Sequence, residues 1–290
     1  MKKSTAVFGA SAALVVLAYA LGGLYLWSQQ GRFVFMPSRV ITRTPADAGL
    51  AYENVFIQVA SDSSGERVHA WWIPSVIPAA PVLIYLHGNA LNIGANVEHA
   101  KRLHGLGISV LLLSYRGYGR SDGDQPSETK IYQDAEAGWH YLVSDQDKSP
   151  ADILIYGHSL GGAVAIELAV RHPEARGLIV ESTFTSIRDM AARSGALRMF
   201  PLALILTQRF DSLSKVDRLR LPVLYLHGTA DNVVPPEMSR RLYEQTRAPK
   251  HLRLISGGGH NNSAQIGGQS YLEGITDFLN ATASGDSPSQ

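Results

Sequence analysis

A serine lies between two glycines in the segment Gly157-His158-Ser159-Leu160-Gly161, directly after the apolar run 153–156. A serine hydroxyl becomes an effective nucleophile when the chain turns sharply from a strand into a helix and holds the serine at the apex. Glycines two residues before and after it allow strand and helix to approach closely, because glycine has no Cβ atom. The spacing therefore predicts that Ser159 is a nucleophile and that the backbone N–H of Leu160 faces a developing oxyanion.

A nucleophilic serine needs a base and an acid that orients the base. In this type of sheet they follow the serine in the order acid, then histidine. Asp231 follows the seventh strand-like run, and His260 follows the eighth after three glycines. Both would lie on loops at the same edge of the sheet as Ser159. We expect Ser159, His260 and Asp231 to form a catalytic triad, with Glu181, at the end of the sixth run, as the alternative acid.

A second oxyanion donor is expected in the segment Leu86-His87-Gly88-Asn89-Ala90, which follows the third strand-like run. In this topology a backbone N–H of that loop faces the serine. We assign the donor to Asn89, with Ala90 as the alternative. Three histidines beside these motifs are assigned structural roles: His87, His158 and His227.

Strands and helices alternate along most of the chain. Strand-like runs occur at 55–60, 68–74, 81–86, 109–115, 153–156, 177–180, 223–226 and 251–255. Helical periodicity occurs at 92–106, 128–144, 161–172, 236–246 and 271–282. This alternation predicts an α/β fold with a mainly parallel eight-stranded sheet and helices on both faces. The first two strands, with no helix between them, predict an antiparallel hairpin at the edge.

One long connection, residues 182–221, interrupts the alternation and contains the apolar stretch 199–206. Connections of this length in compact domains usually have a function, and this one follows the carboxyl end of a strand, where parallel sheets bind ligands. We interpret it as a lid. The alternative is a helix pair packed into the core, because a single apolar face fits both. The last residues, 283–290, predict a flexible tail.

The composition excludes several classes of protein. The chain has 290 residues, of which 45% are hydrophobic, so it can bury a full core. Its 26 basic and 25 acidic residues give a net charge of +1, which does not favour nucleic-acid binding. The absence of cysteine excludes disulfides and thiolate chemistry. No metal-ligand spacing occurs in the sequence, and we expect no cofactor.

The amino-terminal sequence predicts attachment to a membrane. Lys2 and Lys3 precede an uncharged run, 6–27, that would span roughly 33 Å as a helix, about the thickness of a bilayer core. We expect residues 1–30 to form a single-pass anchor that contributes location and none of the catalytic groups. A signal peptide cleaved after Ala20 and a buried core helix are the alternatives.

The side of the membrane is less well specified. Positive residues lie on both sides of the apolar run, so their distribution leaves the orientation open. An extracytoplasmic catalytic domain, residues 31–282, is the working expectation, and secretion after signal cleavage is its alternative.

Several segments together resemble the α/β-hydrolase superfamily, and within it the membrane-anchored bud-emergence-type hydrolases and α/β-hydrolase-domain depalmitoylases. Besides the motif at Ser159, the likeness rests on residues 32–39, 70–74, 87–90, 114–119, 181–186, 209–213 and 227–231. It covers residues 31–279 and implies a serine hydrolase with Ser159, Asp231 and His260 as its triad. Members act on esters, thioesters and lipids.

We therefore expect hydrolysis of a carboxylic ester or thioester with an apolar acyl group, through an acyl-enzyme. A serine peptidase of the prolyl-oligopeptidase type is one alternative, although the chain has no room for the large gating domain of such enzymes. A non-catalytic binding protein on a hydrolase fold is the other. The expected partners are a small acyl substrate and a membrane, and not nucleic acid.

Overall fold

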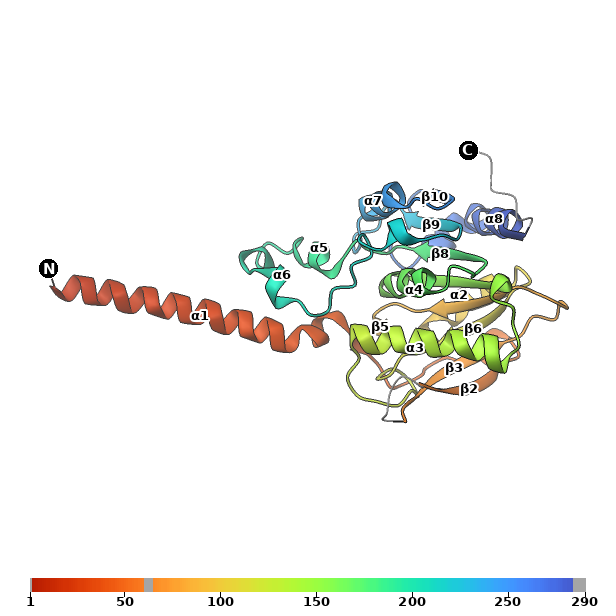
Figure 1. Cartoon of the computed structure of the whole chain (residues 1–290), viewed down its shortest axis with the longest axis horizontal. Coiled ribbons are helices and arrows are strands. Elements are labelled where there is room, and N and C mark those ends of the chain that lie inside the picture. The colour runs from red at the N-terminus through yellow and green to blue at the C-terminus, as the bar shows by residue number, and fades with distance from the viewer. Residues whose placement is uncertain (1, 60–64, 284–290) are drawn as a thin grey trace.

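An eight-stranded sheet forms the centre of the protein, and a long helix projects from it (Figure 1). The structure is a computed structural model that describes residues 2–59 and 65–283, with side chains from residue 11 onward. The sheet contains β2 (Glu53–Gln58), β3 (Arg67–Ile73), β4 (Val82–Leu86), β6 (Ser109–Leu113), β7 (Ile153–His158), β8 (Gly177–Glu181), β9 (Val223–Gly228) and β10 (Lys250–Ile255). A separate two-stranded pair joins β1 (Met36–Pro37) to β5 (Ala90–Leu91).

The strand order is β10-β9-β8-β7-β4-β6-β3-β2. β3 runs antiparallel to both of its neighbours, and the other strands pair in parallel. The predicted mainly parallel sheet and its antiparallel edge hairpin are therefore confirmed.

Helices cover the two faces of the sheet: α2 (Val97–His104), α3 (Glu128–His140), α4 (Leu160–Arg171), α7 (Pro236–Gln245) and α8 (Ser263–Ala283). Other helices lie away from it: α1 (Lys2–Val34), α5 (Ile187–Ala191) and α6 (Leu202–Ile205). Alternate residues of β4 pack in opposite directions: Val82 and Ile84 meet α3 and α4, whereas Leu83 and Tyr85 meet α2 and α8. All of β4 is buried, because both of its faces are covered.

Two predicted helices differ from those observed. The predicted helix 92–106 begins as a 3₁₀ turn, Ile93–Asn96, because the Asn92 side chain accepts a bond from the N–H of Gly94 and caps that turn. The last helix begins at Ser263 rather than at residue 271, with a non-helical residue, Gly268 (φ 47°), inside it. Glycine adopts this conformation readily. Because the kink at Gly268 interrupts the helical periodicity, the sequence pattern did not predict the turns before it.

Two other predicted segments extend beyond the described part of the chain, so their predicted last residues cannot be compared with the structure. The first strand begins at Glu53, two residues before the prediction, and the predicted last residue, Ala60, lies outside the described part of the chain. The predicted tail also lies outside it, except for Ala283 at the end of α8.

Helix α1 continues to Val34, past the predicted boundary at residue 30. Its stretch Ser11–Val34 is long and apolar enough to cross a membrane, and most of it is exposed, with burial confined to Gln30 and Val34 near its end. A buried core helix is therefore wrong. Length and composition fit both an anchor and a signal sequence.

The long connection 182–221 contains only short helices, α5, α6 and three-residue turns. It extends beside α1, away from the sheet (Figure 1). Two of its large apolar side chains are exposed, Met199 by 69% and Leu204 by 84%. This exposure contradicts the alternative of a helix pair packed into the core.

Candidate active site

Ser159 lies at a sharp turn between β7 and α4. Its backbone has φ 55° and ψ −118°, a conformation that costs a non-glycine residue about 1–3 kcal/mol. Two hydrogen bonds hold it there: Ser159 N donates to Glu181 O at 2.9 Å, and Thr183 Oγ1 donates to Ser159 O at 2.7 Å. The strain therefore persists because the surrounding chain fixes the turn.

The two flanking glycines are required by close backbone contacts. A Cβ atom at Gly157 would lie 2.1 Å from the carbonyl oxygen of Gly161. One at Gly161 would lie 2.0 Å from the carbonyl oxygen of Leu86. Neither position has room for a methyl group, as the sequence argument expected.

The structure brings the three predicted catalytic side chains into one line of hydrogen bonds. His260 Nδ1 donates to Asp231 Oδ2 at 2.7 Å, and His260 Nε2 accepts from Ser159 Oγ at 3.0 Å. Asp231 follows β9, His260 follows β10 and Ser159 follows β7, so all three lie at the carboxyl ends of parallel strands. In this arrangement the imidazole can take the hydroxyl proton.

The carboxylate of Asp231 is held by four donors. Oδ1 accepts from the N–H groups of Val233 at 2.9 Å and Val234 at 2.8 Å. Oδ2 accepts from His260 and lies 3.2 Å from His227 Nε2. Burial alone would raise the pKa of Asp231, but the hydrogen bonds from His227, His260 and Val234 outweigh it and hold the pKa below its ordinary value.

His227 also contacts the Asp231 carboxylate, although the sequence assigned it a structural role. Its Nε2–H donates to Val234 O at 2.9 Å, and its Nδ1 accepts from the buried hydroxyl of Ser239 at 2.6 Å. These bonds fix the tautomer whose Nε2 proton also faces Asp231. The four-residue spacing between His227 and Asp231 around a tight loop is the signal that could have identified it.

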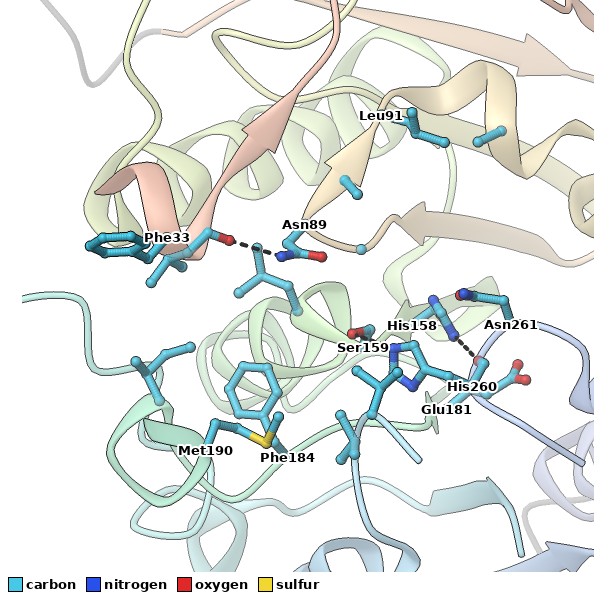
Figure 2. Close-up of a pocket in the computed structure, with 18 of the residues that line it drawn as sticks. Phe33, Asn89, Leu91, His158, Ser159, Glu181, Phe184, Met190, His260 and Asn261 are labelled. Atoms are coloured by element: carbon cyan, nitrogen blue, oxygen red, sulfur yellow. Dashed lines mark hydrogen bonds between the residues drawn. The ribbon is translucent and has the colours of Figure 1, made fainter. Parts of the chain in front are cut away.

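His158 supports the loop that carries His260. Its Nε2–H donates to the carbonyl oxygen of His260 at 2.9 Å, as Figure 2 shows. Burial lowers the pKa of His158, which favours its neutral form. The residue beside Ser159 thus helps to position His260.

Glu181, the alternative acid, has other partners. Its Oε2 accepts from the hydroxyls of Tyr156 and Tyr271, both at 2.5 Å, and lies 3.7 Å from His99 Nε2. No hydrogen bond joins Glu181 to His260 within the described residues. The geometry thus favours Asp231 as the partner of the base.

The loop after β4 lies directly against the serine. A Cβ atom at Gly88 would lie 3.5 Å from Ser159 Cβ. His87 Nδ1–H donates to Gly88 O at 2.7 Å, which fixes the peptide group that carries the N–H of Asn89. Burial lowers the pKa of His87 to about 4, so this histidine is a neutral donor. Leu160 is the first residue of α4, where backbone N–H groups have no acceptor within the helix.

Asn89 also connects this loop to α1. Its Nδ2 donates to Val34 O at 3.0 Å, and its own carbonyl oxygen accepts from Met36 N at 3.0 Å. The end of α1 is therefore tied to the loop that was predicted to supply an oxyanion donor.

Ser159 opens into a cavity of about 1020 Å³. Figure 2 shows Ser159 between an apolar side, with Phe33, Phe184 and Met190, and a polar side, with His158, Glu181 and Asn261. Further apolar lining residues come from α1 and from the 182–221 connection: Leu26, Ile187, Leu197, Leu202, Ile205 and Leu206. Within the described residues, no group of three or more His, Cys, Asp or Glu side chains could hold a metal ion.

Comparison with known proteins identifies the family of this chain. The family model described as "Serine aminopeptidase, S33" matches residues 78–214 and 202–263. An uncharacterized protein of Mycobacterium tuberculosis, Rv2307c, is 34% identical over 272 residues, which cover 93% of this chain and 94% of that protein. Protein bem46 of Schizosaccharomyces pombe is 32% identical over 287 residues, which cover 94% of this chain and 92% of that protein.

Solved structures show the same fold. The esterase Pf2001 of Pyrococcus furiosus superposes with a TM-score of 0.69 over 85% of this chain and 97% of its own, at 21% identity. At this identity the likeness concerns the fold alone. Together with the family match and the relatives, it shows that this chain belongs to the α/β-hydrolase family.

Proposed function

We propose that this protein is a membrane-anchored serine hydrolase that cleaves carboxylic esters or thioesters with an apolar acyl group. The observation that carries the proposal is the line of hydrogen bonds from Ser159 Oγ through His260 to Asp231 at a large cavity. One side of the cavity is apolar, which suits an acyl chain, and α1 suits attachment to a bilayer.

In the proposed reaction, His260 Nε2 takes the Ser159 Oγ proton while Oγ attacks the acyl carbon. The backbone N–H groups of Leu160 and Asn89 stabilise the negative oxygen of the tetrahedral intermediate. The bond to the alcohol or thiol breaks as His260 gives it the proton, and the acyl group stays on Ser159. Water then attacks the acyl-enzyme with His260 as base, so each cycle consumes one water and releases one carboxylic acid.

The first test is Ser159→Ala with a fluorophosphonate probe and a p-nitrophenyl ester. We expect the variant to lose probe labelling and about 10⁶-fold in turnover, because the nucleophile is removed. Its melting temperature should stay close to that of the wild type. A folded variant with normal turnover would show that another residue is the nucleophile. A wild-type protein that neither reacts with the probe nor cleaves any ester would favour the non-catalytic binding protein.

Acyl-chain length tests the apolar side of the cavity. Each buried methylene contributes roughly 0.8 kcal/mol, so kcat/KM should rise up to about fourfold per CH₂ from acetyl to decanoyl esters until the cavity is full. Leu206→Asp should flatten this rise because Leu206 lines the cavity. Val76→Asp is the control, since Val76 is 93% exposed and lies outside the cavity lining. Faster turnover of aminoacyl anilides than of any ester would favour a peptidase instead.

A further inference from the structure

The wall of the cavity is completed by α1. Leu26, Gln30 and Phe33 of this helix line the same cavity as Ser159. Ile205 and Leu206 of the long connection line it as well. The expectation that the anchor contributes location alone is therefore incomplete, because the helix also shapes the space beside the serine.

An apolar contact joins α1 to residues 199–206. The Tyr19 ring stacks on the Phe200 ring with centroids 5.0 Å apart and an interplanar angle of 9°. The Tyr19 hydroxyl donates to Met199 O at 2.7 Å. A Cβ atom at Gly22 would lie 3.1 Å from the Phe200 ring, so this glycine lets the ring lie against the helix. Met199 and Phe200 therefore pack against the side of α1.

A polar contact joins α1 to the connection at the cavity end of this junction. Gln30 is 6% exposed, and its Oε1 accepts from the N–H groups of Thr207 at 2.7 Å and Gln208 at 3.1 Å. Its Nε2 donates to Ile205 O at 3.3 Å. One side chain of α1 therefore satisfies three backbone groups, one on the last residue of α6 and two just after it.

The junction lies at the level where α1 would leave a bilayer. A hydrocarbon core about 30 Å thick takes about 20 helical residues, which, counted from the start of the uncharged run at Ala6, end near Tyr25. Met199 and Leu204 are exposed at the same level, by 69% and 84%. Apolar side chains at this depth contact lipid in place of water, and the exposed Arg198 beside them can reach a headgroup phosphate.

From these contacts we infer that α1 and residues 199–206 form a lateral opening between the bilayer and Ser159. Its occupant is one acyl chain of a lipid-like ester or thioester that is dissolved in the same membrane. The inference rests on the proposed hydrolase function and adds where the substrate comes from: the acyl chain reaches the serine along α1, without passing through water.

The first experiment compares two substrates with the full-length protein in phosphatidylcholine vesicles. One is a fluorogenic hexadecanoyl ester embedded in the vesicles, and the other is the water-soluble butanoyl ester of the same fluorophore. In the variant Leu26→Asp, a carboxylate faces the opening and keeps about two methylenes of the acyl chain out of it. The ratio of hexadecanoyl to butanoyl ester hydrolysis should therefore fall about tenfold. Leu24→Asp, on the exposed side of the same helix, is the matched control and should keep the wild-type ratio.

The experiment gives different results if the lateral opening is wrong and if the proposed hydrolase function is wrong. If the wild type cleaves the butanoyl ester but not the embedded one, or if both aspartate variants keep the wild-type ratio, the lateral opening is wrong and the hydrolase stands. If Ser159 does not react with a fluorophosphonate and neither ester is cleaved, the hydrolase itself is wrong. Probe labelling and melting temperature of each variant show that it is folded.

A second measurement tests contact with lipid directly. Because the chain has no cysteine, Leu204→Cys places a single site for a fluorophore. Ser144→Cys, exposed before β7 at the opposite edge of the sheet, is the control. Spin-labelled phosphatidylcholine should quench the fluorophore at residue 204 and not that at residue 144. Equal quenching at the two positions would overturn the inference.

Discussion

The catalytic edge of the sheet and the junction between α1 and residues 199–206 are held together in different ways. At the catalytic edge, oriented hydrogen bonds fix Asp231 and His260, and backbone atoms leave no space beside Gly161. At the junction, one aromatic ring stacks on another, hydrogen bonds join side chains of α1, Gln30 among them, to backbone groups, and apolar side chains remain exposed. This difference leads us to expect that a single substitution at the catalytic edge abolishes activity. A single substitution at the junction should change activity only in part.

After Ser159→Ala, the largest expected effect is that of Asp231→Asn. An amide can hold the imidazole in the wrong tautomer, so kcat should fall about 10⁴-fold although the fold survives. Glu181→Gln is the control at the same edge, and its kcat should change little, because Glu181 contacts tyrosine hydroxyls and not His260. Ester hydrolysis by the two variants, normalised to folded protein, measures both. The opposite order of damage would make Glu181 the acid.

A pair of glycine variants compares the two regions in terms of stability. Gly161→Ala places a methyl group 2.0 Å from a backbone oxygen, which must move, so we expect a loss of about 3 kcal/mol or more in unfolding free energy. Gly22→Ala meets only the tip of the Phe200 ring at 3.1 Å, which can turn aside, and should cost less than about 1 kcal/mol. Denaturant unfolding in detergent measures both. Equal losses would show that the junction is as rigid as the elbow.

The smallest expected effect is a dependence of stability on pH at the catalytic edge. Hydrogen bonds depress the pKa of Asp231 in the folded protein, so its contribution to stability is present above the carboxyl's unfolded pKa, near 4, and is lost as pH falls through the folded value. The stability gap between wild type and Asp231→Asn should therefore narrow as pH is lowered from 6 to 3. A gap that stays constant would contradict the hydrogen-bonded carboxylate.

Much of this architecture could be predicted from the sequence because its signals are local. Apolar runs of β-strand length gave the eight strands of the sheet, and the order of Ser159, Asp231 and His260 predicted the residues that the structure joins by hydrogen bonds. The sequence favoured Asp231 over Glu181, but the position at the carboxyl end of a strand is common to both, so only the observed hydrogen bonds separate them.

Other features depend on contacts between distant segments, which periodicity does not reveal. The pair of β1 and β5 has two residues in each strand, too few for any alternation. Gln30 meets residues more than 170 positions later in the chain. Within the short helix α6, no sequence pattern could show that Ile205 lines the cavity while Leu204 faces outward.

The bonds made by Gln30 bear on how this enzyme should be prepared in the laboratory. Truncation before Gly31 is an obvious way to obtain soluble protein, and it would keep every group at the catalytic edge. It would also remove the acceptor for the N–H groups of Thr207 and Gln208 and delete Leu26 from the cavity wall. Such a preparation should still cleave short esters, but its acyl preferences would be those of a cavity with one wall missing.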